Sequence, residues 1–457
     1  MIIEDYRIDE GKGKTALLVN PPVYDFAYSN TYNQPDGLLR VATLLKEKGY
    51  RTALIDFLSE RKFGRIPEFP QDGTIFKGFS RKHYGMAYKE FEKRLAALSF
   101  YPDEILVTSI MTYWWESTRD TIRILRRFFP KSKILLGGIY PTLCPEHADA
   151  NVGADVVVKG EIREASDSWT DVSLYDRTPS YAIINFSRGC PFSCAYCAQR
   201  TLNGVGMRYR NPIDIVNEIE SKHTLGVNNF WVFSDNFLVG DIFPKVLNEI
   251  VTRGLRISLS APKGMEPRLI THDLLRLMKK AGWKTINMAF ESSNADFRQE
   301  SWSRRHNTNS DFERAVRLST EYGFKQEAGG IVGFVLFGAP EERFADVIET
   351  ARYLHSEGIF IRPMPFTPVP TTAIFEKYRD YIESRRLKLE ELNEKLYPFA
   401  DLNGIPLEKY LGLHKWMFEL NSELRKTNRV RLFGAEDLLD FQMKVPSFRL
   451  TACGCAV

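Results

Sequence analysis

The stretch SRGCPFSCAYCAQR (187–200) holds half of the six cysteines of the chain. Cys190, Cys194 and Cys197 follow the spacing C-x3-C-x2-C, and the apolar run YAIINF (181–186) just before them predicts a buried strand. A structural zinc site takes four ligands, commonly as two C-x2-C pairs, and neither a second pair nor a histidine lies nearby in the sequence. Three thiolates instead suit a [4Fe–4S] cluster with one iron left open for a substrate or cofactor.

Strand and helix signals alternate from residue 181 onward. Stretches such as LLRLMKKAG and FERAVRLSTEYG have the spacing of helices, and six apolar runs between them predict strands. The predicted strands are 181–186, 229–233, 256–260, 285–290, 329–337 and 360–366. We therefore expect a partial (β/α)6 barrel over 181–372, with its chemistry at the carboxyl ends of the strands. Residues 373–457 are mostly helical by pattern.

The first third of the chain has its own alternation of strands and helices. The predicted strands are 15–20, 51–56, 104–109, 133–138 and 155–161. This order predicts a doubly wound parallel sheet over 1–162, which binds ligands at the carboxyl ends of its strands. Residues 60–102 interrupt the pattern as an aromatic and basic insertion, either a lid or a surface excursion. Residues 163–180 are expected to form a linker.

The composition narrows the functional classes. A net charge of +4 over 457 residues gives no support for nucleic-acid binding through bulk electrostatics. The start MIIEDYRIDEGKGKT lacks the apolar segment of a signal peptide, and no apolar run approaches the roughly 18 residues of a membrane helix. We expect a cytoplasmic protein of two or three domains, whose clustered cysteines serve metal or redox chemistry.

The cysteine stretch resembles the radical S-adenosylmethionine (SAM) enzymes, whose signature C-x3-C-x-aromatic-C has Tyr196 at its aromatic position. Further segments are similar to family motifs in the expected order: FSDNF (233–237), FESS (290–293), RRHNT (304–308), GGIVG (329–333) and TPVPTT (367–372). The acid that often follows the glycine motif is replaced here by Leu336. The resemblance implies SAM-binding roles for Tyr196, Ser234, Asp235, Glu291, Ser292, Arg305 and Gly333.

The same resemblance implies a chemistry and a partner. In this family the cluster donates one electron to SAM, and the 5′-deoxyadenosyl radical that results takes a hydrogen atom from the substrate. The protein holds SAM, excludes water and positions the substrate. A reductase or other electron donor is the partner that such chemistry requires.

Residues 15–162 resemble the cobalamin (B12) binding domains that precede many radical SAM barrels, and they imply a Rossmann-like cobalamin domain. The D-x-H-x-x-G segment that supplies a cobalt-binding histidine is missing, and neither His83 nor His147 lies in that setting. The lower face of cobalt is then covered by Tyr113, Trp114 or Trp115, or these aromatics belong to the core or the substrate pocket. The implied cobalamin-binding residues are Asn20, Pro21, Pro22, Ser109, Met111, Thr112, Tyr113, Trp114, Gly137, Gly138, Gly160 and Glu161.

The leading hypothesis is a cobalamin-dependent radical SAM methyltransferase, which methylates an unactivated carbon through the radical and methylcobalamin. The alternative keeps both cofactors but performs a cyclisation, oxidation or rearrangement. Methylthiotransferases carry three extra cysteines in the first domain, where this chain has Cys144 alone. An iron–sulfur protein that only carries electrons would need no SAM pocket. The substrate stays open between a small molecule, a lipid-like molecule and a peptide.

The remaining cysteines, Cys453 and Cys455, form a C-x-C pair near the end of the sequence. Two thiolates do not complete a second cubane. They ligate or cover a cofactor, form a redox pair, or lie in a disordered tail.

Overall fold

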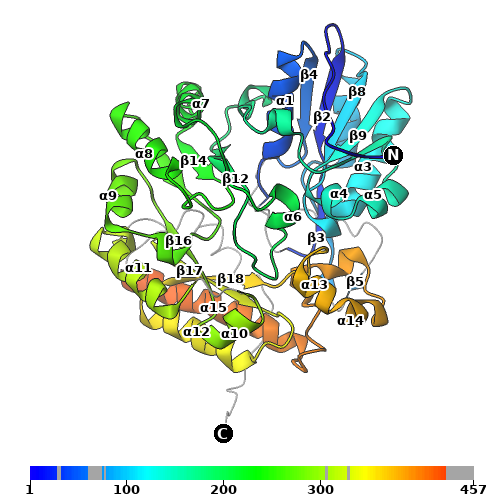
Figure 1. Ribbon diagram of the computed structural model, residues 1–457. Coiled ribbons are helices and arrows are strands. Elements are labelled where there is room, and N and C mark those ends of the chain that lie inside the picture. Colours follow the sequence, from blue (N-terminus) through cyan, green and yellow to red (C-terminus); the bar gives the residue numbers. More distant parts are fainter. Residues whose placement is uncertain (28–31, 60–74, 77–78, 304–306, 327–329, 429–457) are drawn as a thin grey trace. The chain divides into compact units, whose positions relative to one another are not determined.

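The computed structural model describes residues 1–27, 32–59, 75–76, 79–303, 307–326 and 330–428 (Figure 1). The chain forms two compact units, Met1–Leu259 with Pro368–Leu396 and Ser260–Thr367 with Tyr397–Val457. The region expected to be mostly helical after residue 372 is helical in its described part, residues 373–428, and is divided between the units. Helices α13 (Ala373–Lys377) and α14 (Arg379–Ser384) belong to the first unit, and α15 (Leu407–Asn428) belongs to the second.

A six-stranded sheet forms the beginning of the first unit, with strand order β1-β10-β9-β8-β2-β4. All neighbouring strands are parallel, which confirms the expected doubly wound sheet. The strands are β1 (Ile2–Glu4), β2 (Thr15–Asn20), β4 (Arg51–Asp56), β8 (Glu104–Thr108), β9 (Lys133–Gly137) and β10 (Val156–Lys159). Strand β1 is the one that the sequence pattern did not predict, since three residues at the start of the chain give no periodicity.

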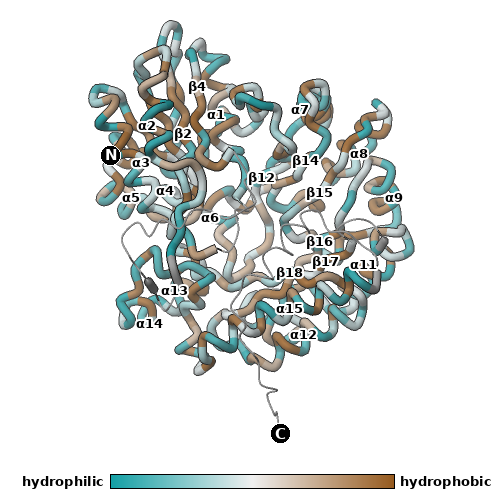
Figure 2. The backbone as a smooth tube through the Cα atoms, turned by 180° about the vertical axis from the view of Figure 1, so that it is seen from behind, coloured by the Kyte–Doolittle hydropathy of each residue, from teal (hydrophilic) through white to brown (hydrophobic). Residues whose placement is uncertain are grey.

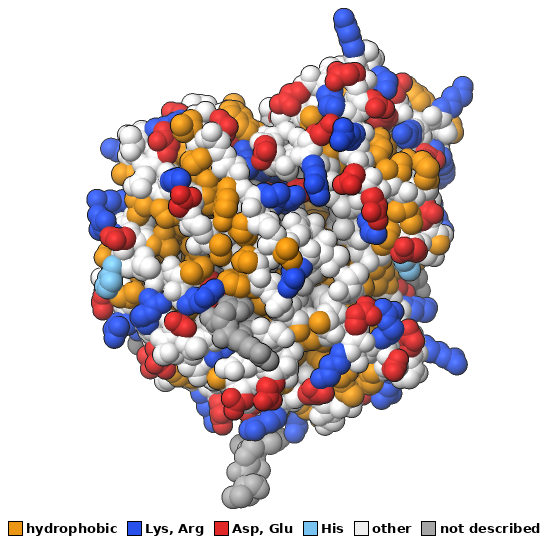
Figure 3. Space-filling view, viewed as in Figure 1, with side chains coloured by type: hydrophobic (Ala, Val, Ile, Leu, Met, Phe, Trp, Pro, Cys, Tyr) orange, Lys and Arg blue, Asp and Glu red, His pale blue; other side chains and the backbone are white. Residues whose placement is uncertain are grey.

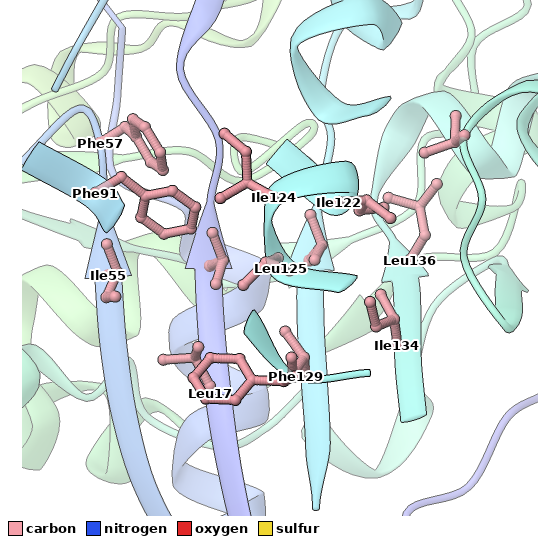
Figure 4. Close-up of a cluster of buried hydrophobic side chains, with 14 of the residues drawn as sticks. Leu17, Ile55, Phe57, Phe91, Ile122, Ile124, Leu125, Phe129, Ile134 and Leu136 are labelled. Atoms are coloured by element: carbon pink, nitrogen blue, oxygen red, sulfur yellow. The ribbon is translucent and has the colours of Figure 1, made fainter. Parts of the chain in front are cut away.

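Helices cover both faces of this sheet because successive strand residues point to opposite sides. Leu17 lies in a buried cluster with side chains of α3 (Trp115–Phe128), part of which is shown in Figure 4. The next residue, Leu18, packs on the other face against α1 (Asp36–Glu47). Strands that are buried on both faces read as continuous apolar runs, as β2 and β8 do here.

Part of the predicted insertion is core structure. Strand β7 (Lys82–Tyr84) pairs antiparallel with β3 (Val23–Asp25), and α2 (Tyr88–Ala96) places the fully buried Phe91 in the core of the sheet. These elements are therefore neither a lid nor a surface excursion, because Phe91 of α2 is part of the hydrophobic core of the sheet (Figure 4). Residues 60–74 lie outside the described residues.

All six predicted strands of the barrel are present, in two parallel sheets of three with orders β11-β14-β15 and β16-β17-β18. They are β11 (Ala182–Ile184), β14 (Asn229–Val232), β15 (Ser258–Ser260), β16 (Ile286–Glu291), β17 (Ile331–Phe337) and β18 (Phe360–Pro365). The helices that follow strands in the chain include α7 (Pro212–Thr224), α8 (Ile242–Thr252), α9 (His272–Lys280), α11 (Asn309–Glu321) and α12 (Phe344–Ser356). In Figure 2 these helices mix hydrophobic and hydrophilic stretches, as expected for helices with one buried face.

Helix α15 lies against β18, the last strand of its sheet. The buried side chain of Asn421 accepts a hydrogen bond from the amide nitrogen of Ile361 at 2.7 Å and donates one to the carbonyl oxygen of the same residue at 2.7 Å. One side chain therefore satisfies both backbone groups of this strand residue. Among the described residues, no helix is both long and apolar enough to cross a membrane.

Candidate cofactor site

The cysteine stretch forms the loop of a hairpin. Strands β12 (Ser187–Arg188) and β13 (Arg208–Tyr209) pair antiparallel, and all three cysteines lie between them. At the start of the loop Gly189 has φ +90, and a Cβ atom there would lie 2.1 Å from the carbonyl oxygen of Gly206. Only glycine fits this crossing of the two chain segments, so the hairpin geometry depends on it.

The three cysteines are half-buried and carry thiols rather than disulfides. The amide nitrogen of Cys197 donates to the carbonyl oxygen of Cys194 at 3.1 Å, and that of Cys190 donates to Gly204 at 3.2 Å. In the described parts of the chain, no three His, Cys, Asp or Glu side chains gather around one point as ligands of a single ion would. In a cubane each thiolate binds a different iron, so its ligands are spread more widely. Three accessible thiols on one loop therefore fit a [4Fe–4S] cluster.

Ser234 and Asp235, predicted to bind the SAM amino group, hold the backbone of the cluster loop. The buried Ser234 Oγ accepts from the amide nitrogen of Phe186 at 2.5 Å. Asp235 Oδ2 accepts from the amide nitrogen of Gly189 at 2.8 Å and from Asn203 Nδ2 at 2.9 Å. The Asp235 carboxylate thus bonds to both ends of the cluster loop. The spacing of residues in the sequence did not predict this role. The contact of Asp235 with SAM remains a prediction.

The segment after the last barrel strand, which resembles a closing motif of the family, packs on the same loop. The amide nitrogen of Ile374, in α13, donates to the carbonyl oxygen of Ala195 at 3.1 Å. The hydroxyl groups of Thr371 and Thr201 lie 3.4 Å apart. The cysteine loop is therefore supported from outside its own hairpin.

Of the remaining predicted SAM residues, Tyr196 lies on the cysteine loop in the first unit, and the others belong to the second unit. Glu291 ends β16 with φ +64, a strained conformation for this residue type, and is buried together with Ser292. Gly333 has a packing role, since a Cβ atom there would meet the side chain of Leu354 in α12 at 2.8 Å. Arg305 lies outside the described residues, as do Cys453 and Cys455.

The predicted cobalamin residues gather at the carboxyl ends of β2, β8, β9 and β10. Those buried in the chain are Asn20, Pro21, Pro22, Ser109, Thr112 and Tyr113. The others are partly accessible, namely Met111, Trp114, Gly137, Gly160 and Glu161, or exposed, as Gly138 is. A Cβ atom on Gly137 or Gly160 would meet no atom within 4 Å, so space is open directly in front of the backbone. This open edge fits a planar cofactor that approaches the main chain.

Neither histidine of the first domain is freely presented at this edge. His83 is buried, with Nε2 2.8 Å from the carbonyl oxygen of Met86. His147 Nδ1 lies 2.7 Å from the hydroxyl group of Tyr140, and its ring packs edge-on against Trp115. Burial lowers the pKa of both imidazoles. These contacts agree with the expectation of cobalamin held without a protein histidine.

The aromatics proposed to cover cobalt belong to a buried polar network. Tyr113 donates to Glu394 Oε2 at 2.5 Å, and Trp114 Nε1 donates to the fully buried Asp25 at 3.3 Å. Asp25 also accepts from Asn393 at 2.8 Å and pairs with Lys395 at 3.3 Å. Burial lowers the pKa of Lys395, but the neighbouring carboxylates raise it above its usual value. Sequence reasoning missed this network, whose members lie almost 370 positions apart.

Glu161, predicted to bind cobalamin, forms ion pairs with the hairpin that carries the cysteines. Its carboxylate lies 2.9 Å from Arg188 Nε and 2.6 Å from Arg208 Nη2. The residue directly follows Gly160 at the end of β10. The pairs therefore connect the open edge of the six-stranded sheet to the base of the cluster loop.

Comparison with known proteins identifies two domains in the chain. Residues 27–168 match the B12 binding domain, and residues 184–354 match the Radical SAM superfamily. The two matches together occupy more than half of the chain, which therefore belongs to the radical SAM enzymes that carry a B12-binding domain. Its cofactors are accordingly a [4Fe–4S] cluster, SAM and cobalamin.

Among curated proteins, two anaerobic magnesium-protoporphyrin IX monomethyl ester cyclases are similar to this chain. Those of Rubrivivax gelatinosus and Cereibacter sphaeroides are 27% and 28% identical and cover 44% and 65% of the chain. The chain spans only 36% and 56% of their lengths. The hopanoid C-2 methylase of Rhodopseudomonas palustris is 24% identical, and the match covers 44% of each protein.

Among solved structures, the radical SAM methyltransferase TsrM from Kitasatospora setae has the same fold. It aligns over 81% of this chain and 76% of its own with a TM-score of 0.61 at 16% identity. TsrM has also been solved with cobalamin and a [4Fe–4S] cluster bound. The likeness extends through both matched domains, which confirms the order of a Rossmann-like cobalamin domain followed by a partial barrel and helices.

Proposed function

We propose that the protein is a cobalamin-dependent radical SAM methyltransferase that methylates an unactivated carbon. When bound, the cofactors supply a 5′-deoxyadenosyl radical and a cobalt-borne methyl group. The observation that supports this most directly is the state of His83 and His147, which are both held by other groups of the chain. With both histidines held in this way, cobalamin would be bound without a protein histidine and would supply the methyl group for a substrate radical.

The side chains of the protein have positioning roles in this proposal. Cys190, Cys194 and Cys197 would hold the [4Fe–4S] cluster, which would supply the electron for cleavage of SAM. Asp235 fixes the loop that carries them. The open backbone at Gly137 and Gly160 receives the corrin ring.

The test measures products that do not require a known substrate. The full chain is reconstituted anaerobically with cluster and cobalamin, then incubated with reductant and SAM. We expect both S-adenosylhomocysteine and 5′-deoxyadenosine, since only methyl transfer combined with radical formation gives both. SAM with a deuterated methyl group should label the bound cobalamin. The Cys194→Ala variant is the control for products formed without a cluster.

A second candidate follows from the cyclase relatives, which have the higher identities among the curated proteins described above. A cyclisation, oxidation or rearrangement would use both cofactors and produce 5′-deoxyadenosine without S-adenosylhomocysteine. That outcome would contradict the methyltransferase proposal and support the alternative. The absence of both products would contradict the two candidates together.

The proposal also includes a partner and a compartment. The cluster must receive electrons from outside the chain, so we place a reductase or a small electron carrier as partner. Thiols that bind iron stay reduced in the cytoplasm, where we place the protein. The substrate is a small molecule, a lipid-like molecule or a peptide.

A further inference from the structure

The first unit contains a hollow at the base of the cluster hairpin. It encloses about 270 Å³, part of which opens to solvent. Its lining residues come from the linker, from the end of β11 and from both hairpin strands: Ser166, Asp167, Asn185, Ser187, Arg188, Arg208 and Arg210. Figure 3 shows Lys and Arg side chains gathered near β12, in the middle of the visible face. None of these residues is part of the cofactor sites proposed above.

Two buried polar groups of this lining have no hydrogen-bond partner among the described residues. Ser187 is 2% exposed, and its hydroxyl group bonds to no protein atom. Arg210 is 6% exposed, and its Nε has no acceptor. Buried polar groups in folded proteins nearly always have a partner, so an unpaired hydroxyl and an unpaired guanidinium N–H in one hollow indicate a missing acceptor.

The charges of the lining indicate the kind of acceptor. Three guanidinium groups face this hollow, whereas Asp167 is its one carboxylate. Glu161 pairs with Arg188 and Arg208, and Glu218 pairs with Arg210 at 2.9 Å. Each guanidinium has five N–H donors, and these pairs occupy only some of them. Planar donors of this kind match the oxygens of phosphate.

We propose that this hollow binds a phosphate oxyanion, either free inorganic phosphate or the phosphate group of a larger ligand. The hydroxyl group of Ser187 and the Nε of Arg210 donate to its oxygens, and the side chain of Arg208, at the solvent-exposed side, completes the site. Because Ser187 and Arg208 lie on the two paired strands, the oxyanion fastens the hairpin that carries the cluster cysteines.

Titration of the full chain with inorganic phosphate tests the proposal by calorimetry and by thermal unfolding, at constant ionic strength set with chloride. We expect saturable binding and a rise of the unfolding temperature. Ser187→Ala and Arg208→Gln should each weaken phosphate binding by about tenfold or more. Arg163→Gln, in the linker but outside the hollow and 76% exposed, should leave it unchanged. No saturable effect beyond chloride, or equal weakening by Arg163→Gln, would overturn the proposal.

Arg208→Gln keeps the proposal testable if Ser187→Ala fails to fold, since the Arg208 side chain is 43% exposed. A competition identifies the source of the phosphate. Cobalamin carries a phosphate in its nucleotide tail, whereas cobinamide has the corrin ring without it. Competition by cobalamin alone would assign the site to that tail, and competition by neither would assign it to free phosphate or another ligand. Phosphate binding needs no catalysis, so its failure is distinct from failure of the proposed reaction.

Discussion

Asp235 Oδ2 lies 2.8 Å from the amide nitrogen of Gly189, so a residue in the loop after the second barrel strand fixes the first residue of the cluster loop. The same oxygen accepts from Asn203 at the far end of that loop. Replacing Asp235 with Ala removes both bonds and should cost about 1–3 kcal/mol of folding free energy. We expect reconstituted Asp235→Ala to hold clearly less iron and sulfide per chain, measured chemically and by the visible absorption of the cluster.

A matched control is available close by in the chain. Asp241 is 77% exposed and pairs with Lys245, about one helical turn further along the chain. Asp241→Ala should keep both stability and iron content, because exposed ion pairs contribute little. Full iron content in Asp235→Ala would mean that the loop keeps its shape without the carboxylate.

The four described cysteines should differ in their importance for the cluster. Alanine in place of Cys190, Cys194 or Cys197 should abolish the cluster spectrum, whereas Cys144→Ala should retain it. Burial, together with Glu146, raises the pKa of the Cys144 thiol to about 12, so this group stays protonated and is a poor metal ligand. Loss of iron in Cys144→Ala would contradict this assignment.

Two adjacent glycines at the end of β9 should respond differently to alanine. Gly138 has φ +110, and a Cβ atom there would lie 2.4 Å from the carbonyl oxygen of Ser109. Gly138→Ala should therefore destabilise the fold by about 1–3 kcal/mol. Gly137 has open space at its Cβ position, so Gly137→Ala should fold normally but bind cobalamin more weakly. Urea unfolding and cobalamin titration measure the two effects, and unaltered cobalamin affinity in Gly137→Ala would place the corrin elsewhere.

The buried Glu342 should make stability depend on pH. Burial raises its pKa from 4.5 to about 8, although the amide nitrogens of Gly338 and Ala339 stabilise the charged form. The native state therefore holds this proton more tightly than the unfolded state does. Its contribution to stability is complete below about pH 4.5 and is lost as the pH rises through 8.

Replacement of this carboxyl by an amide gives the measurement. Glu342→Gln should unfold with less dependence on pH, and above pH 8 it should be more stable than the unaltered protein by on the order of a few kcal/mol. Identical slopes for Glu342→Gln and the unaltered chain between pH 5 and 8 would show that Glu342 titrates normally.

The parts of the fold that sequence could predict are those with a local signal. The strand expected at 15–20 is β2 (Thr15–Asn20), and that expected at 360–366 is β18 (Phe360–Pro365), because apolar runs are visible over a few residues. Helix α2 was not predicted, because its buried Phe91 lies within a polar and basic segment. Its hydrophobic contacts come from a sheet far away in the sequence.

The candidate site, too, has parts that the sequence could predict and parts that it could not. The cysteine spacing is local, and the apolar run before it placed the loop directly after a strand, although the two short hairpin strands β12 and β13 were not predicted. Asp25 and Lys395 form an ion pair across almost the whole chain, and neither lies in a motif. Gly333 matched a motif, but its contact with Leu354 shows that a glycine in a pattern serves packing as readily as binding. Contacts between distant segments arise only when the chain has folded, so the pattern of residues adjacent in the sequence does not predict them.

The double hydrogen bond of Asn421 with Ile361 has a consequence for crowded solutions. A last strand normally offers its backbone N–H and C=O groups to any extended segment, including the same strand of another molecule. Here the amide side chain of Asn421 takes the hydrogen bonds that a neighbouring strand would make with Ile361. Helix α15, which carries Asn421, lies where another strand would have to pair with β18. Self-association through this strand would first have to displace the helix, which makes the open end of the sheet resistant to aggregation.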